Sequence, residues 1–133
     1  MINNPNYETQ KDEIELLRNI LFEKMTVLEE MPQFIIQIDL NPDIVEEAIL
    51  NFIITSTLIP EYPEKEPQIE IEETTNNLPS SKIYKLKEEI ANFCKENCGM
   101  PMIYQIYEMI KVIDLFKFFI ILFFKVYYFF TII

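Results

Sequence analysis

The stretch that decides the fold is Pro60-Glu61-Tyr62-Pro63-Glu64-Lys65-Glu66-Pro67. It places three prolines within eight residues. Proline lacks the N–H that a strand needs for the hydrogen-bond ladder of a sheet. The chain before it is rich in β-branched residues, and the chain after it alternates isoleucine with glutamate; both patterns are typical of strands. The stretch is therefore predicted to be an ordered turn or a solvent loop between two strands.

Four strands are predicted around this turn, over residues 25–29, 33–40, 48–57 and 68–72. The second strand has the alternation of a half-buried strand, with Phe34, Ile36, Ile38 and Leu40 on one face. The third strand is apolar on both faces, which favours a central position in the sheet. In the fourth strand Ile69 and Ile71 are expected to point inward. Asn41-Pro42-Asp43 has the composition of a turn.

A first helix is predicted over residues 7–22, with Asn6 as its N-cap. Its apolar stripe consists of Tyr7, Ile14, Leu17, Ile20 and Leu21. A second helix is predicted over residues 81–97, capped by Ser80, with the stripe Ile83, Leu86, Ile90 and Phe93. Gly99 is placed to end this helix in a left-handed conformation.

A third helix follows, with Pro101 in its first turn. Its stripe is Ile103, Ile106, Tyr107, Ile110 and Ile113. The order is therefore helix, four strands, helix, helix. Strands joined by short turns form a meander, and helices at the chain ends cover one of its faces. The predicted fold class is α+β, a two-layer sandwich with a four-stranded antiparallel meander covered by helices on one face.

Composition excludes several classes of function. The chain has 133 residues, enough for one domain, and a formal net charge of −11, which repels nucleic-acid phosphates. It has no histidine, which excludes Ser-His and Cys-His catalytic pairs and imidazole-ligated metals. Its one glycine, Gly99, cannot build a glycine-rich phosphate loop. We therefore expect no catalytic residue, cofactor, metal site or bound nucleic acid.

The two cysteines, Cys94 and Cys98, lie four residues apart on the second predicted helix. They are expected to be reduced thiols, because no secretory signal is visible at the N-terminus. A nucleophilic thiolate needs nearby cations or a helix N-terminus, whereas these thiols lie near a helix C-terminus beside Glu96. A structural or incidental role is therefore favoured over catalysis or metal binding.

Three blocks of the chain resemble the RWD domain, a relative of the ubiquitin-conjugating fold that lacks its catalytic cysteine. They are residues 6–17 (NYETQKDEIELL), residues 61–67 (EYPEKEP) and residues 97–104 (NCGMPMIY). The second contains the Y-P-x-x-x-P hallmark of the family as Tyr62, Pro63 and Pro67. The blocks stand in the family's order, and the third is most similar to RWD domain-containing protein 1-like proteins.

The resemblance implies a non-catalytic protein–protein interaction module. RWD domains dock onto partners in translation control, notably a ribosome-associated activator of the starvation-sensing kinase. A cytoplasmic role of that kind is the first hypothesis for this chain. The alternative is an adaptor in a ubiquitin-ligase pathway, acting in trans because the sequence has no RING cysteines. Neither hypothesis specifies an oligomeric state.

Two groups of residues are singled out for a role. The first is structural: Tyr62, Pro63, Pro67 and Gly99, with the Tyr62 ring packed and its hydroxyl bonded locally. The second is acidic: Glu8, Asp12 and Glu15 on the first helix, then Glu61, Glu64, Glu66, Glu70, Glu72 and Glu73 around the turn. The acidic side chains form either an ordinary solvated face or an electrostatic dock for a partner with a basic surface.

The segment from Leu115 to Ile133 is strongly apolar apart from Lys117 and Lys125. As a helix it would span roughly 28 Å, about the thickness of a bilayer's hydrocarbon core. Three interpretations are open: a membrane anchor for a tethered cytosolic adaptor, a buried continuation of the third helix, or translated non-coding sequence from an AT-rich genome. The predicted organisation is thus an RWD-like domain over residues 1–112 and an apolar tail over residues 113–133.

Overall fold

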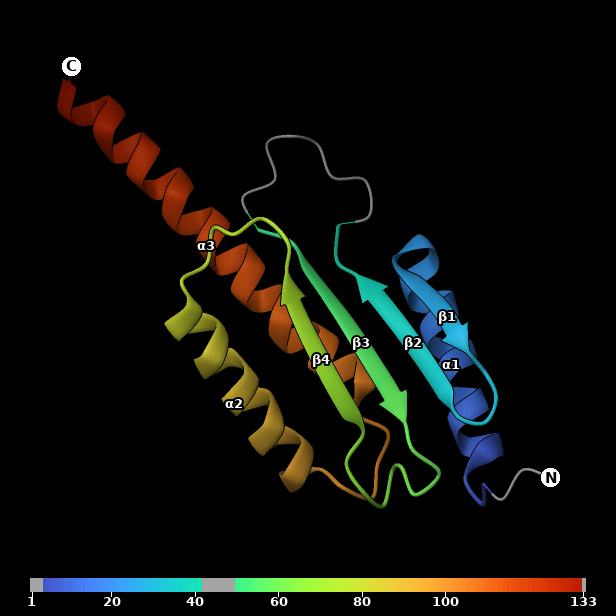
Figure 1. Ribbon diagram of the computed structural model, residues 1–133. Helices are drawn as coiled ribbons and strands as arrows, with labels where there is room; N and C mark the ends of the chain where they lie inside the picture. Colours follow the sequence, from blue (N-terminus) through green and yellow to red (C-terminus); the bar gives the residue numbers. More distant parts are fainter. Residues whose placement is uncertain (1–3, 42–49, 133) are drawn as a thin grey trace.

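The computed structural model describes residues 4–41 and 50–132, except the side chains of residues 114–125, 128, 130 and 132 (Figure 1). The predicted order of elements is confirmed. The helices are α1 (Tyr7–Leu21), the 3-10 turn η1 (Phe22–Lys24), α2 (Ser80–Glu96) and α3 (Ile103–Ile132). The strands are β1 (Met25–Glu29), β2 (Phe34–Asp39), β3 (Phe52–Leu58) and β4 (Gln68–Glu73).

The four strands form one antiparallel sheet in the order β1-β2-β3-β4. Register places a row of buried apolar side chains straight across it, because Ile38 pairs with both Met25 and Ile54, and Ile54 pairs with Ile71. The side-chain period of two puts every second residue of β3 on this inner face. The alternation predicted for β2 is confirmed, since all four inward residues are buried.

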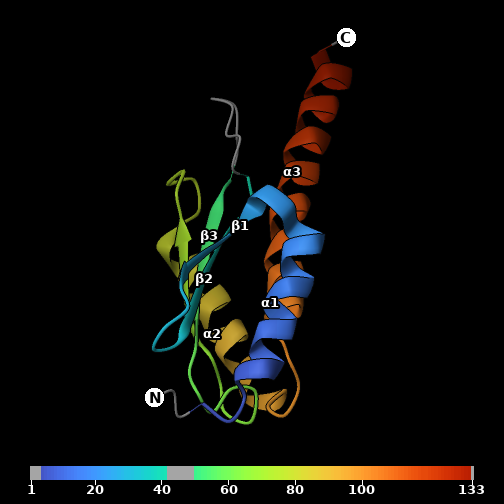
Figure 2. The same ribbon diagram turned by 90° about the vertical axis from the view of Figure 1, so that its right-hand side faces the viewer.

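The helices lie on one side of the sheet, so the predicted two-layer arrangement is confirmed (Figure 2). The core between the layers contains Leu17 and Leu21 of α1, Ile90 of α2, and Ile106 and Ile110 of α3, none more than 5% exposed. Burying such side chains contributes roughly 1.5–3 kcal/mol each before conformational entropy is subtracted. No helix within residues 4–41 and 50–132 lies on the other face of the sheet (Figure 2).

Several local expectations at helix ends are wrong. Asn6 stands at the N-cap position of α1 as predicted, but its side chain makes no capping hydrogen bond, and Ser80 is the first residue of α2 rather than its cap. Pro101 lies before α3, which begins two residues later at Ile103. Ile20, assigned to the buried stripe, is 44% exposed. A capping residue is predicted from its neighbours in the sequence. The position of each of these side chains also depends on how the helix packs against the rest of the fold.

The prediction for Gly99 is confirmed. It follows the end of α2 with φ +104°, a conformation that side-chain-bearing residues rarely adopt. Its N–H donates to Pro63 O at 2.7 Å, which joins the end of α2 to the proline-rich turn. The predicted turn at Asn41-Pro42-Asp43 lies, beyond Asn41, outside the described residues.

Helix α3 continues well past the sheet, and its C-terminal half extends away from the two layers (Figure 1). Three described apolar side chains of this half, Val126, Tyr127 and Phe129, are 47–63% exposed. Within the part of the chain that the structure describes, no helix combines the length and hydropathy needed to cross a membrane. The division into a domain over residues 1–112 and a tail over residues 113–133 stays a prediction.

Candidate functional site

The proline-rich turn is organised around Tyr62, which is fully buried. Its hydroxyl donates to Glu13 Oε2 at 3.0 Å and accepts from the Met102 N–H at 2.7 Å. The same Glu13 oxygen accepts from the Ile103 N–H at 3.2 Å. The hydroxyl therefore does not bond locally, because its partners are 49 and 40 residues away along the chain. It connects α1 to the N-terminus of α3.

A second set of side chains clamps the same turn from α1. Gln10, also fully buried, donates through Nε2 to Ile59 O and Tyr62 O, both at 2.9 Å. Asn6 donates through Nδ2 to Pro60 O at 3.0 Å and to Glu64 Oε2 at 2.8 Å. These bonds supply donors to the carbonyls of Pro60 and Tyr62, and they add a second donor to Ile59 O, which also accepts from the Tyr62 N–H at 2.9 Å. We call Gln10, Glu13, Tyr62 and the backbone of Met102 and Ile103 the Tyr62 network.

The network contains one titratable carboxyl with a shifted pKa. Burial raises the pKa of Glu13, and the hydrogen bonds from Tyr62 and Ile103 offset only part of that effect. Its second oxygen, Oε1, is buried with no hydrogen-bond partner among the described residues. Burial and the neighbouring Glu13 also raise the pKa of Tyr62, so its hydroxyl remains a donor. The network is thus rigid and sensitive to the protonation of Glu13.

Stability should depend on pH through Glu13. The native carboxyl keeps its proton to a higher pH than the unfolded chain, in which the pKa is about 4.5. Its contribution is therefore complete below that value and declines as the pH rises through the raised native pKa. The free energy of unfolding of the wild type, minus that of Glu13→Gln, is expected to fall as the pH rises from 4.5 towards neutrality, measured by urea unfolding.

Glu8→Gln is the matched control, since it removes a carboxylate from the exposed side of the same helix without touching the Tyr62 network. Its difference from the wild type should not follow the Glu13→Gln profile. A Glu13→Gln difference that is flat across this pH range would contradict the proposed protonation of Glu13.

The acidic residues of α1 lie where the helical period places them. Gln10, Glu13 and Leu17 face the core, and Glu8, Asp12 and Glu15 fall on the exposed side. We call these three exposed carboxylates the α1 acidic row. Hydrogen bonds of Gln10 and Glu13 hold this helix against the turn, so the row is presented on a firmly anchored element.

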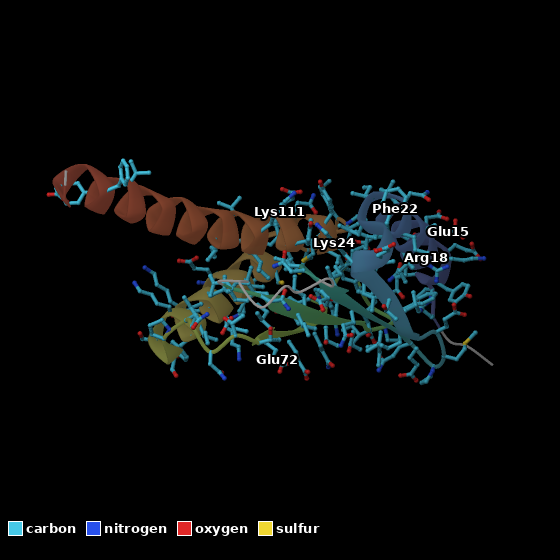
Figure 3. The ribbon with its side chains drawn as sticks, turned by 90° about the horizontal axis from the view of Figure 1, so that it is seen from above. Glu15, Arg18, Phe22, Lys24, Glu72 and Lys111 are labelled. Atoms are coloured by element: carbon cyan, nitrogen blue, oxygen red, sulfur yellow. The ribbon has the colours of Figure 1, made fainter. Side chains whose placement is uncertain are left out.

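The acidic residues around the turn are spread over several parts of the surface. Glu61 and Glu64 are exposed near the N-terminus of α1, where Asn6 bonds Glu64, and Glu66 is half-buried. Glu70 and Glu72 are exposed on β4. Figure 3 shows Glu72 on the sheet side of the molecule and Glu15 on the helix side.

Glu73 does not belong to a solvated face, because it is only 9% exposed. Its burial would raise the pKa, but hydrogen bonds from Thr75, Asn51 and Asn76 together lower it. The Glu73 carboxylate stabilises the connection that follows β4, because its Oε1 accepts from the N–H groups of Asn51 and Thr75. A run of glutamates in the sequence therefore contains both a surface charge and a structural acceptor.

The cysteines lack the setting of a reactive site. Cys94 is buried, and desolvation together with Glu66 raises its pKa to about 11, so the thiol is protonated at neutral pH. Cys98 is exposed, and its Sγ–H donates to Cys94 O at 3.3 Å. Among the described residues there is no cluster of three or more His, Cys, Asp or Glu that could hold a metal ion.

Gln10 and Glu13 are the residues that sequence reasoning missed. Each lies four positions before a residue of the apolar stripe, Gln10 before Ile14 and Glu13 before Leu17, so both share the helical spacing of the stripe. Polar residues on a buried stripe indicate a buried hydrogen-bond network. That signal was present in the sequence, although it does not identify Tyr62 as the partner.

Comparisons with known proteins agree with this geometry. The sequence profile of the RWD domain matches residues 8–113. The solution structure of the RWD domain of mouse GCN2 is similar to this chain, with a TM-score of 0.61 and 22% sequence identity, covering 74% of this chain and 77% of that one. No curated protein matches significantly. Because the profile spans most of the sequence, from α1 to the sheet-covering part of α3, the chain belongs to the RWD domain family.

Proposed function

We propose that this chain is a non-catalytic protein-interaction module in cytoplasmic translation control, which docks to a ribosome-associated activator of the starvation-sensing kinase. Membership in the RWD family supports an interaction role. The protonated, buried Cys94 thiol is unsuited to nucleophilic chemistry, in keeping with a binding role.

The observation that carries the proposal is the α1 acidic row. Glu8, Asp12 and Glu15 are exposed on a helix that the Tyr62 network fixes to the rest of the domain. Carboxylates held on a rigid element lose little conformational entropy of the backbone on binding. They favour a partner with a basic surface, and such complementarity increases the association rate and the specificity more than the affinity.

Reversing the three charges tests this proposal. The variant Glu8→Lys, Asp12→Lys, Glu15→Lys is expected to associate with the purified activator at least about tenfold more slowly at low salt. The difference should shrink as salt is added, because screening removes long-range attraction between exposed charges. Surface plasmon resonance over a salt series, with the full chain immobilised, measures both effects.

A control with the same change in net charge separates the row from the charge of the whole molecule. Glu88→Lys, Glu89→Lys, Glu96→Lys reverses three exposed acids on α2, which lies beside β4, at the opposite edge of the sheet from α1 (Figure 1). This control should associate as the wild type does, apart from a small general effect. Equal association rates for the two variants, or no binding of the wild-type chain to the activator, would argue against the proposal.

A further inference from the structure

A hollow of about 700 Å³ lies where the end of α1 meets α3. Its lining includes Ile20, Phe22, Lys24, Tyr104, Tyr107 and Lys111. Phe22 is 75% exposed, Ile20 44% and Tyr104 37%, so apolar and aromatic surface is open to solvent there. Figure 3 shows Phe22, Lys24 and Lys111 gathered at this junction. We call this site the α1–α3 hollow.

Two ammonium groups flank one aromatic ring in the hollow. Lys24 Nζ and Lys111 Nζ each lie 5.8 Å from the centroid of the Tyr107 ring, so the amines are separated by at most twice that distance. Lys24 Nζ also donates to the Tyr107 hydroxyl at 3.2 Å. Lys24 is therefore fixed at the hydroxyl edge of the Tyr107 ring, and Lys111 is within cation–π distance of the same ring.

The charge of the hollow differs from that of the rest of the chain. The whole sequence has 22 acidic and 11 basic residues. The hollow has two lysines and two glutamates, Glu23 and Glu108. A ligand carboxylate between Lys24 and Lys111 would form charge-assisted hydrogen bonds.

The backbone at Phe22 is a second, independent observation. Its φ of 48° and ψ of −119° correspond to the first central position of a type II′ turn, where glycine dominates because a side chain is strained. A large aromatic residue occupies this position, and its ring points to solvent rather than into the core. Strained residues of this kind occur preferentially at binding sites, where the strain is retained for function.

We propose that the α1–α3 hollow docks a peptide segment of a partner protein in which an acidic residue stands next to a large apolar one. The carboxylate lies between Lys24 and Lys111, and the apolar side chain packs on Phe22, Ile20 and Tyr104. This surface is separate from the α1 acidic row and takes a ligand of opposite charge. It extends the proposed function and does not depend on it.

The probe is a displayed library of random peptides selected on the full chain, followed by titration of a synthetic selected peptide. Peptides with an acidic residue beside an aromatic or large aliphatic one should be enriched. Lys24→Ala and Lys111→Ala should each raise the Kd roughly tenfold. Binding should shift the amide resonances of residues 22–24, 104 and 111.

Phe22→Gly distinguishes a ligand-binding role from a structural one. Glycine tolerates this backbone conformation, so the melting temperature should be unchanged or higher, while the Kd for the peptide rises roughly tenfold. The charge-reversed α1 variant of the previous section should bind the peptide as the wild type does, which separates the two proposals.

Four results would overturn the inference. They are no enrichment of any peptide, enrichment without acidic residues, and binding that survives both lysine substitutions. The fourth is a concentration-dependent dimer, measured by light scattering, that Phe22→Gly abolishes, since the occupant of the hollow would then be a second copy of the chain.

Discussion

Replacing Tyr62 with alanine is expected to lower the free energy of unfolding by about 4 kcal/mol. The side chain is fully buried, so the substitution leaves a cavity. It also leaves the Met102 N–H without its acceptor and removes a donor from Glu13 Oε2. A loss of this size is a large part of the 5–15 kcal/mol typical of a small domain.

Tyr62→Phe separates the two contributions to this loss. It keeps the ring and removes only the hydroxyl, so the expected loss is about 2 kcal/mol, the range for leaving buried polar groups unpaired. Chemical unfolding monitored by circular dichroism measures both variants. Tyr84→Phe is the matched control, because Tyr84 is 71% exposed, and it should change stability little. Equal effects of Tyr62→Phe and Tyr84→Phe would contradict the role of the hydroxyl.

Changing Gln10 to glutamate is expected to lower the free energy of unfolding by at least about 3 kcal/mol near neutral pH. The two side chains have nearly the same shape, but a carboxylate cannot donate to Tyr62 O, which accepts from Gln10 Nε2, or to Ile59 O, which would keep only the Tyr62 N–H. Burial also makes an unpaired charge unfavourable at this site. The loss should be smaller at acid pH, because a protonated carboxyl has one O–H to donate.

Gln105→Glu is the control for this substitution. It makes the same chemical change at a side chain that is exposed to solvent on α3. It should alter stability by less than about 0.5 kcal/mol. Urea unfolding at neutral and acid pH checks the two variants together. If Gln10→Glu is as mild as Gln105→Glu, the turn does not depend on the Gln10 amide.

The Tyr62 network also bears on function, because it fixes the element that presents the α1 acidic row. Gln10 and Glu13 are buried on the same helix that exposes Glu8, Asp12 and Glu15. Loss of the network would loosen α1 and the turn together. Binding experiments should therefore use variants of the row and not of the network.

The sheet was the most predictable part of the molecule. Phe34, Ile36, Ile38 and Leu40 recur at every second position, and this local pattern indicates which face of the strand meets a core. The prolines between β3 and β4 exclude a strand from the turn by their covalent structure alone. Information of this kind lies within a few residues, so it can be read without knowing the fold.

The helix ends and the charged residues were less predictable. Asn6 has the chemistry of a cap, yet its amide donates to Pro60 O, 54 residues away. Glu73 follows Glu72 directly, yet one is buried and the other exposed. A carboxylate or an amide suits solvent, a cap or a buried bond equally well, and only its surroundings select among these.

The chain by itself determined the order of the helices and strands, the inward face of each strand, and the family to which the Tyr-Pro-x-x-x-Pro turn belongs. The tertiary structure alone decided that Tyr62 bonds Glu13 and Met102, and that Lys24 and Lys111 meet at Tyr107. The physical reason is the distance along the chain over which each effect acts. Periodicity and proline act on neighbours, whereas a buried hydrogen bond or a cluster of charges requires segments 40 or more residues apart to be packed together.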